Sequence, residues 1–142
     1  MTPLQRERVA AEAITWLGTP YHHHGRVKRA GVDCAQILCA VYEACGLVPP
    51  IQTGHYPTDW HFHRSEEIYS GWLEKYCEKL GKDDPPLVGD IALFRFGRCF
   101  SHGAILIGDG LVIHAYIGRG VILSNINEEP LDGRAIIYWR VK

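Results

Sequence analysis

Hydrophobic residues in the first part of the chain recur at intervals of three and four, which is the period of an amphipathic helix. Thr2 and Gln5 have the spacing of a capping box around Pro3, and Gly18 follows the last apolar residue. We therefore predict a helix over residues 3–17. Its apolar stripe consists of Val9, Ala10, Ala13, Ile14, Trp16 and Leu17.

The same spacing returns twice further along the chain. Residues 34–45 place their apolar side chains on one face, with Asp33 as a cap at the start and Gly46 at the end. Residues 65–80 repeat the pattern up to Gly81. Residues 18–31 and 47–64 have no regular period, and we predict that they form loops of a length that often carries function.

After Pro86 the pattern changes to short β-rich runs that turn residues separate. Helices first and strands afterwards predict an α+β fold, in which N-terminal helices pack on a C-terminal antiparallel sheet. A chain of 142 residues suggests one domain, residues 1–142. The predicted strands are Ile91–Phe96, Gly103–Ile107, Leu111–Ala115, Val121–Ser124 and Ala135–Val141.

Composition excludes several classes of protein. A formal net charge of −1 gives no basis for binding nucleic acid, and the sequence holds no apolar run long enough to span a membrane. Charges within the first 17 residues argue against a secretory signal, so we expect synthesis in the cytoplasm. Five cysteines, an odd number without paired spacing, argue against a disulfide framework.

Cys34 directly follows Asp33, at the predicted start of the second helix. Unpaired N–H groups and the helix dipole favour a thiolate there, and a nearby imidazolium would favour it further. A buried structural thiol is the alternative, since buried cysteine is the common case. We expect a catalytic partner to be a histidine that folding brings near Cys34.

His102 and His114 lie in the strand-forming half, on either side of residues 108–110. If these three residues form a hairpin loop, Ile107 faces Leu111 and the two histidines become diagonal neighbours on one face, roughly 7 Å apart between backbones. A two-residue turn would place the two rings on opposite faces. The sequence allows both turns, but a catalytic triad requires the first.

Given that register, each residue has a role. Cys34 is the candidate nucleophile, and its backbone N–H is a candidate oxyanion donor. His102 is the candidate base, and then the acid for the leaving amine. His114 would orient His102 through a hydrogen bond.

The stretches "GTPYHHHG…GVDCAQ", "VGDIALFRF" and "SHGAILIGDGLVIHA" resemble an NlpC-type cysteine peptidase of the papain-like fold. The resemblance covers roughly residues 9–116. It implies Cys34, His102 and His114 as the catalytic triad and a bacterial cell-wall stem peptide as the substrate. Such enzymes often cut between D-glutamate and a diamino acid.

The same resemblance implies two substrate-binding residues, and a third candidate lies beside His102. Tyr21 would form a wall of the active site near the oxyanion, and Asp33 would contact the free amine of the stem peptide. Ser101, which directly precedes His102, is placed with them. Tyr21 and Asp33 each have a plainer alternative, as a packing residue and as a helix cap.

Two departures from the family pattern bear on specificity. Ala35-Gln36 follow the cysteine where the family commonly has Ser-Gly, and His22–Gly25 replace a common tryptophan-glycine pair. With "HYPTDWHFHR" at residues 55–64, this is similar to the compact version associated with tails of phages and gene transfer particles. The resemblance thus implies tail proteins as partners and a virion or tail-like particle as the location.

Two other functions stay open. One is a structural tail component whose peptidase fold has weak or no catalysis, which the missing serine suggests. The other is a metal-dependent amidase, since His61 and His63 would share a face of an extended segment. No acidic or cysteine ligands have an evident place beside them, so we predict no metal and no cofactor.

Overall fold

The computed structural model describes residues 1–54 and 65–142. The helices and strands follow one another in an order of helices first and strands afterwards, with two short strands inside the first loop. They are α1 (Pro3–Ile14), β1 (Arg26–Val27), β2 (Gly31–Val32), α2 (Gln36–Ala44), α3 (Ser65–Tyr76), β3 (Cys77–Lys79), β4 (Ile91–Phe96), β5 (Cys99–Gly108), β6 (Leu111–Tyr116), β7 (Gly120–Asn125) and β8 (Ile136–Val141).

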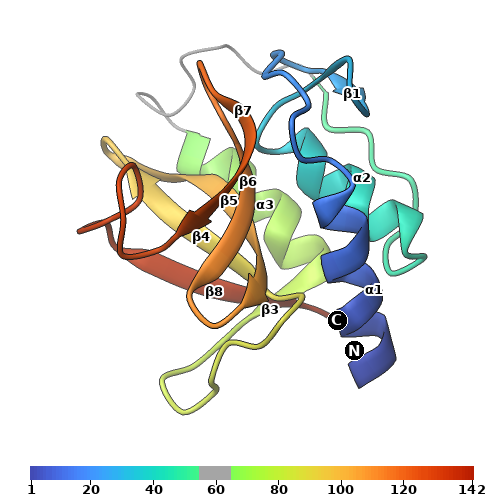
Figure 1. Cartoon of the computed structure of the whole chain (residues 1–142). Coiled ribbons are helices and arrows are strands. Elements are labelled where there is room, and N and C mark those ends of the chain that lie inside the picture. The colour runs from blue at the N-terminus through green and yellow to red at the C-terminus, as the bar shows by residue number, and fades with distance from the viewer. Residues whose placement is uncertain (55–64) are drawn as a thin grey trace.

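The larger sheet has the strand order β3-β8-β4-β5-β6-β7, and the neighbouring strands run antiparallel. The three helices lie together beside one face of this sheet (Figure 1). β5 is central to the arrangement, because α1, α2 and α3 all contact it. The predicted α+β fold is therefore confirmed.

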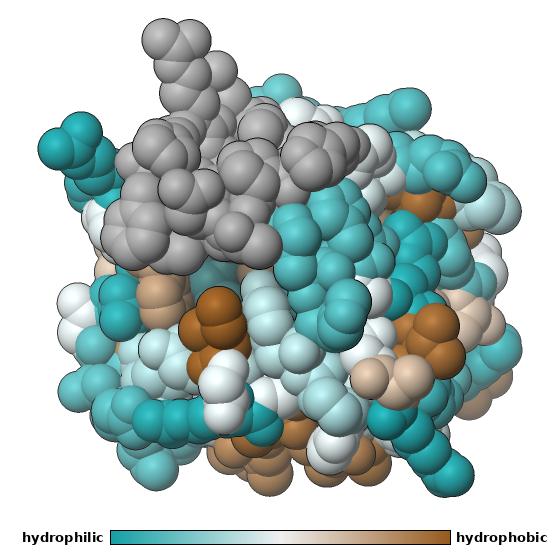
Figure 2. Space-filling model, turned by 90° about the horizontal axis from the view of Figure 1, so that it is seen from above, coloured by the Kyte–Doolittle hydropathy of each residue, from teal (hydrophilic) through white to brown (hydrophobic). Residues whose placement is uncertain are grey.

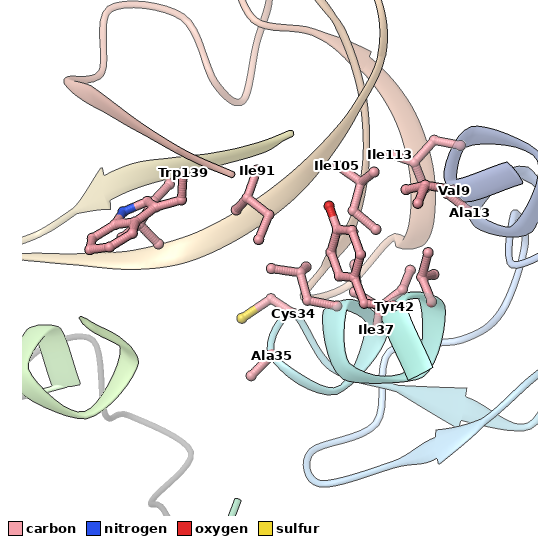
Figure 3. Close-up of a cluster of buried hydrophobic side chains, with 14 of the residues drawn as sticks. Val9, Ala13, Cys34, Ala35, Ile37, Tyr42, Ile91, Ile105, Ile113 and Trp139 are labelled. Atoms are coloured by element: carbon pink, nitrogen blue, oxygen red, sulfur yellow. The ribbon is translucent and has the colours of Figure 1, made fainter. Parts of the chain in front are cut away.

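The main hydrophobic core lies between the helices and the sheet. Val9 and Ala13 of α1 and Ile37 of α2 face Ile105 of β5 and Ile113 of β6, and all five side chains are fully buried (Figure 3). A second, smaller cluster lies on the other face of the sheet. Its buried members are Ala92, Phe94, Ala104, Leu106, Val112 and Leu131.

The outer surface can be seen on one face of the molecule (Figure 2). Seen from above, the visible part is mainly hydrophilic, and hydrophobic residues form small separate groups (Figure 2). Among the helices in the described part of the chain, none combines the length and hydropathy that crossing a bilayer requires.

α1 begins as predicted and ends early. Thr2 and Gln5 form the capping box, through hydrogen bonds between each side chain and the other's backbone N–H. The helix ends at Ile14, before the predicted Leu17, because Trp16 and Leu17 bond to carbonyls three residues back. Such bonds tighten the last turn away from α-helical geometry.

The prediction that the third helix reaches Leu80 is wrong. α3 ends at Tyr76, and Cys77, Glu78 and Lys79 pair with the end of β8 as strand β3. Cys77 is buried in the strand as it would have been in the helix. The apolar spacing therefore could not distinguish a helix from a strand at Cys77. Pairing with β8, some 60 residues later in the chain, makes this segment a strand.

A buried carboxylate ties the two ends of the chain together. Asp90, fully buried just before β4, accepts hydrogen bonds from Arg6 of α1 and from Arg140 of β8 at 2.7–3.0 Å. Burial alone would raise the pKa of Asp90, but Arg140, the N–H of Leu87 and Arg6 outweigh it and lower that pKa. The ionised carboxylate therefore holds α1 and the last strand against the start of β4.

Candidate active site

The start of α2 is organised by Asp33, whose carboxylate is buried. Its Oδ1 accepts hydrogen bonds from the N–H groups of Ala35 and Gln36 at 3.1 and 2.9 Å, and its Oδ2 accepts one from His24 N–H at 2.8 Å. Asp33 thus binds N–H groups at the helix start, but the predicted cap position is shifted: regular helix begins at Gln36 rather than residue 34, and Ala35 occupies the N-cap. The Asp33 side chain also anchors the preceding histidine-rich loop.

Cys34 lies between this helix start and β5. Its Sγ is 3.8 Å from the carbonyl oxygen of Ser101, to which the thiol donates, and the N–H of Gly103 lies near enough to lower its pKa. The Tyr21 hydroxyl, the N–H of Gly103 and the N–H of Cys34 itself are the nearby donor groups that favour the charged form of the sulfur. Cys34 therefore contacts the backbone of β5 on both sides of His102.

The expectation of a lowered Cys34 pKa is wrong for this conformation. The residue is only 5% exposed, and burial raises the pKa of the thiol well above its usual range. The Asp33 carboxylate raises it further, and the three hydrogen-bond donors offset only part of this increase. Helix geometry favours the thiolate, but desolvation of the charge is the larger effect.

His102 and His114 are in direct contact. A hydrogen bond of 2.7 Å joins Nε2 of His102 to Nδ1 of His114, and both rings are buried. Aromatic side chains surround His102. They are Phe94, Phe96 and Tyr116, with ring centroids 6.4, 4.8 and 5.8 Å from that of His102.

The β5–β6 hairpin combines both predicted turn geometries. Ile105 pairs with Ile113, which is the register that the three-residue loop requires. At the tip, however, Gly108 pairs with Leu111 across a two-residue turn. A bulge between Leu106 and Gly108 absorbs the extra residue, so the two histidines stay on one face.

His114 continues the hydrogen-bond chain into the next strand. Its Nε2 lies 2.8 Å from the Oγ of Ser124 on β7. Burial lowers the pKa of His114 to about 4, with Arg119 contributing through charge repulsion. His114 is therefore a neutral imidazole at neutral pH, which can orient His102 without sharing its charge.

The structure places the three predicted substrate-binding residues around Cys34 in different ways. The Tyr21 hydroxyl lies beside Sγ, and burial, together with the nearby Cys34 and Asp33, raises the pKa of Tyr21 well above its usual range. Ser101 is the extra residue of a bulge, since Phe94 pairs with His102 and Arg95 with Phe100. Its own hydroxyl donates to the Cys99 carbonyl, so only its backbone oxygen meets the sulfur.

Sequence reasoning missed three residues of this site: Tyr69, Gly103 and Ser124. The Tyr69 hydroxyl donates to the Cys34 carbonyl at 3.2 Å, and a side chain on Gly103 would collide with Tyr69 and Leu38. Ser124 could have been found by extending the hairpin register to the next strand, where it lies diagonal to His114. Nothing in the sequence pairs Tyr69 with Gly103.

The histidine-rich segments form no recognisable metal centre in the part of the chain that the structure describes. Within residues 1–54 and 65–142, no three histidine, cysteine, aspartate or glutamate side chains are grouped to hold a metal ion. His55, His61 and His63, which suggested the metal hypothesis, lie outside the described residues.

Solved structures define the class of this protein as the papain-like NlpC/P60 fold. The NlpC/p60 domain of the peptidoglycan hydrolase SagA superposes with a TM-score of 0.61 at 24% identity, covering 96% of this chain and 97% of that one. NlpC2 from Trichomonas vaginalis gives a TM-score of 0.70 at 20% identity, over 96% and 46%. At these identities the likeness establishes the fold alone.

The sequence model of the NlpC/P60 family matches residues 18–140, so the chain belongs to that family. It is 26% identical over 136 residues to the murein DD-endopeptidase MepS/murein LD-carboxypeptidase of Escherichia coli K12, covering 95% of this chain and 58% of that protein. A probable endopeptidase NlpC homolog from Haemophilus influenzae is 28% identical over 125 residues, 87% of this chain and 52% of its own length. The chain thus spans little more than half the length of these curated relatives.

Proposed function

We propose that this protein is a cysteine peptidase that hydrolyses peptide bonds in the stem peptides of bacterial peptidoglycan. One observation carries the proposal. In a chain of the NlpC/P60 family, a thiol at the start of α2 contacts β5 at both neighbours of His102, and His102 is hydrogen-bonded to His114. The relatives, a murein endopeptidase and a peptidoglycan hydrolase, support the substrate class.

In the first half of the reaction, the thiol proton passes to His102 as Sγ attacks the carbonyl carbon of the scissile bond. Since Nε2 of His102 is bound to His114, Nδ1 is the nitrogen that takes this proton. The C–N bond then breaks, His102 gives its proton to the leaving amine, and a thioester remains on Cys34. The Cys34 N–H and the Tyr21 hydroxyl are the candidate donors to the oxyanion.

In the second half, His102 removes a proton from water as the water oxygen attacks the thioester carbonyl. The C–S bond breaks, the peptide leaves as a carboxylic acid that ionises in water, and the Cys34 thiolate recovers its proton from His102. Because burial raises the Cys34 pKa, the thiolate is formed as proton transfer to His102 occurs rather than standing ready at neutral pH. Peptide hydrolysis by this route needs no metal ion.

The first test is release of peptides from purified peptidoglycan, followed by liquid chromatography and mass spectrometry. We expect Cys34→Ala to lower the rate on the order of 10³-fold or more, because the variant has no nucleophile. Cys45→Ala, near the other end of the same helix, is the matched control and should keep wild-type activity. The masses of the released fragments identify which bond is cut.

Retained peptide release by a folded Cys34→Ala variant would exclude the thiol mechanism. Iodoacetamide and a metal chelator then separate the alternatives. A cysteine peptidase is inactivated by the alkylating reagent and not by the chelator, whereas a metal-dependent amidase gives the opposite result.

The association with phage or gene-transfer-particle tails stays a proposal that rests on the compact sequence pattern. If it is right, mass spectrometry of purified particles finds this chain as a stoichiometric component. Particles that assemble and deliver DNA normally with Cys34→Ala would favour the structural role over the catalytic one. Particles that lack the chain would contradict both tail hypotheses.

A further inference from the structure

Ser124 lies at the end of the hydrogen-bond chain that begins at His102. The chain crosses three adjacent strands, from Nε2 of His102 to Nδ1 of His114 and from Nε2 of His114 to Oγ of Ser124, at 2.7 and 2.8 Å. The pairing of Val112 with Ser124 places this hydroxyl on the same face as His114. Both nitrogens of the buried His114 ring therefore have a defined partner.

A neutral imidazole carries one N–H, so these two hydrogen bonds depend on each other. In one arrangement His114 holds its proton on Nε2, donates it to Ser124, and accepts at Nδ1 from His102. In the other arrangement Ser124 donates to Nε2, and the proton on Nδ1 is donated to His102. The low pKa of His114 removes a third arrangement, in which both nitrogens are protonated at neutral pH.

Only the first arrangement is compatible with the proposed chemistry. When His102 holds the thiol proton, both of its nitrogens carry hydrogen, and its Nε2–H must find an acceptor. That acceptor is the Nδ1 of His114, so the His114 proton must lie on Nε2 and face a group that accepts it. The second arrangement would set two N–H donors against each other between the rings.

We propose that Ser124 is a positioning residue of the active site: its Oγ accepts the Nε2–H of His114 and thereby selects the tautomer that lets His102 take the thiol proton. This inference rests on the proposed peptidase function. Ser124 acts through His114 and touches neither Cys34 nor the substrate in this scheme. The alternative is that the hydroxyl only fills space on β7.

Other groups around His114 do not duplicate this role. Tyr116 on β6 and His102 on β5 contact its ring, and the Arg119 cation in the following turn disfavours protonation of His114. The Arg119 guanidinium has only N–H donors and is paired with Glu129, so it cannot accept from Nε2–H. Removing the Ser124 hydroxyl therefore removes the acceptor seen in the structure.

The test compares Ser124→Ala with Ser124→Thr, which keeps the hydroxyl. Leu123→Ala, the exposed neighbour on β7, is the matched control for loss of side-chain atoms. We expect Ser124→Ala to lower kcat for peptide release on the order of 10-fold with little change in KM, as outer hydrogen-bond partners typically do. We also expect it to raise the pH at which Cys34 alkylation is half-maximal. Ser124→Thr should restore both.

A second measurement reads the tautomer without using activity. In wild-type protein at pH 7, ¹⁵N chemical shifts should show a protonated Nε2 and an unprotonated Nδ1 in His114, and Ser124→Ala should shift them toward a mixture. Unchanged ring shifts together with an unchanged pH profile in Ser124→Ala would overturn the inference. That result leaves the proposed function intact, whereas an active Cys34→Ala variant would remove the function itself.

Discussion

At the scale of single residues, burial decides the protonation states in this site. Cys34 lies where the backbone N–H groups of a helix start favour a thiolate, yet its pKa is raised because the sulfur is buried beside Asp33. His114 is driven the same way, toward its neutral form, and its pKa falls to about 4. Both groups are therefore uncharged in the resting protein, and in the proposed mechanism a thiolate and an imidazolium form only when a proton moves from Cys34 to His102.

The neutral His114 makes stability depend on pH in a defined direction. An unfolded histidine has a pKa near 6.5, so below that pH the unfolded chain takes up a proton that folded His114 refuses. This contribution to stability is therefore complete above about pH 6.5 and is lost as the pH falls toward 4, with a total of roughly 3 kcal/mol. Urea unfolding at a series of pH values measures it.

The variant His114→Gln has no titrating group at this position. The loss of unfolding free energy between pH 7 and pH 4 should therefore be smaller in this variant than in the wild type, by roughly 3 kcal/mol. His22→Gln is the control, since His22 lies on the surface. If the unfolding free energies of His114→Gln, His22→Gln and the wild type all fall by the same amount between pH 7 and pH 4, the fold does not hold His114 neutral.

At the scale of elements, the close approach of α3 to β5 shapes the site. Tyr69 of α3 reaches past Gly103 to donate its hydroxyl to the Cys34 carbonyl. A Cβ on Gly103 would collide with the Tyr69 hydroxyl and come within 3.0 Å of Leu38. The glycine is needed for this approach rather than for an unusual backbone angle.

Gly103→Ala should therefore destabilise the protein by about 1–3 kcal/mol, the usual range for overpacking a buried site. Adding Tyr69→Phe removes the atom nearest to the new methyl group, so the double variant should regain part of the loss even though Tyr69→Phe alone loses a hydrogen bond. Urea unfolding of the three variants forms a double-mutant cycle. Strict additivity of the two substitutions would contradict the packing argument.

Sequence periodicity and capping predicted the helices and strands that are determined by residues close together in the sequence. α1 has the predicted cap, β4 has the predicted bounds, and the Asp33 carboxylate binds N–H groups at the start of α2. β3, β1 and β2 were missed because two or three residues carry no period, and only their partners make them strands. The end of α1 shifted because tighter turns replaced the last α-helical bonds, and the end of α3 shifted because Cys77–Lys79 pair with β8.

The candidate site was predictable to the extent that it depends on strand register. The contact between the His102 and His114 rings follows from the register of the β5–β6 hairpin. The sequence did not reveal that a bulge would allow a two-residue turn at the tip of the hairpin while keeping that register. The raised pKa of Cys34 could not be predicted, since it depends on how deeply β5 and Tyr21 cover the sulfur. The assignment of these residues as a catalytic triad stays a prediction.

At the scale of the whole molecule, the site joins two halves of the chain. The helical half supplies Cys34, and the sheet supplies the two histidines. The Asp90 ion pairs hold the halves together at the other end of the core, where Arg6 and Arg140 meet one carboxylate. In the proposed mechanism, the imidazole of His102 controls the proton on Cys34.

The pH dependence of Cys34 alkylation, in wild type and in His102→Gln, tests that claim most directly. Iodoacetamide labelling followed by peptide mapping resolves Cys34 from Cys39, Cys45, Cys77 and Cys99, which serve as internal controls. We expect His102→Gln to move the half-maximal pH for Cys34 upward by at least one unit and to leave the other four cysteines unchanged. Superimposable Cys34 profiles in the two proteins would contradict the account.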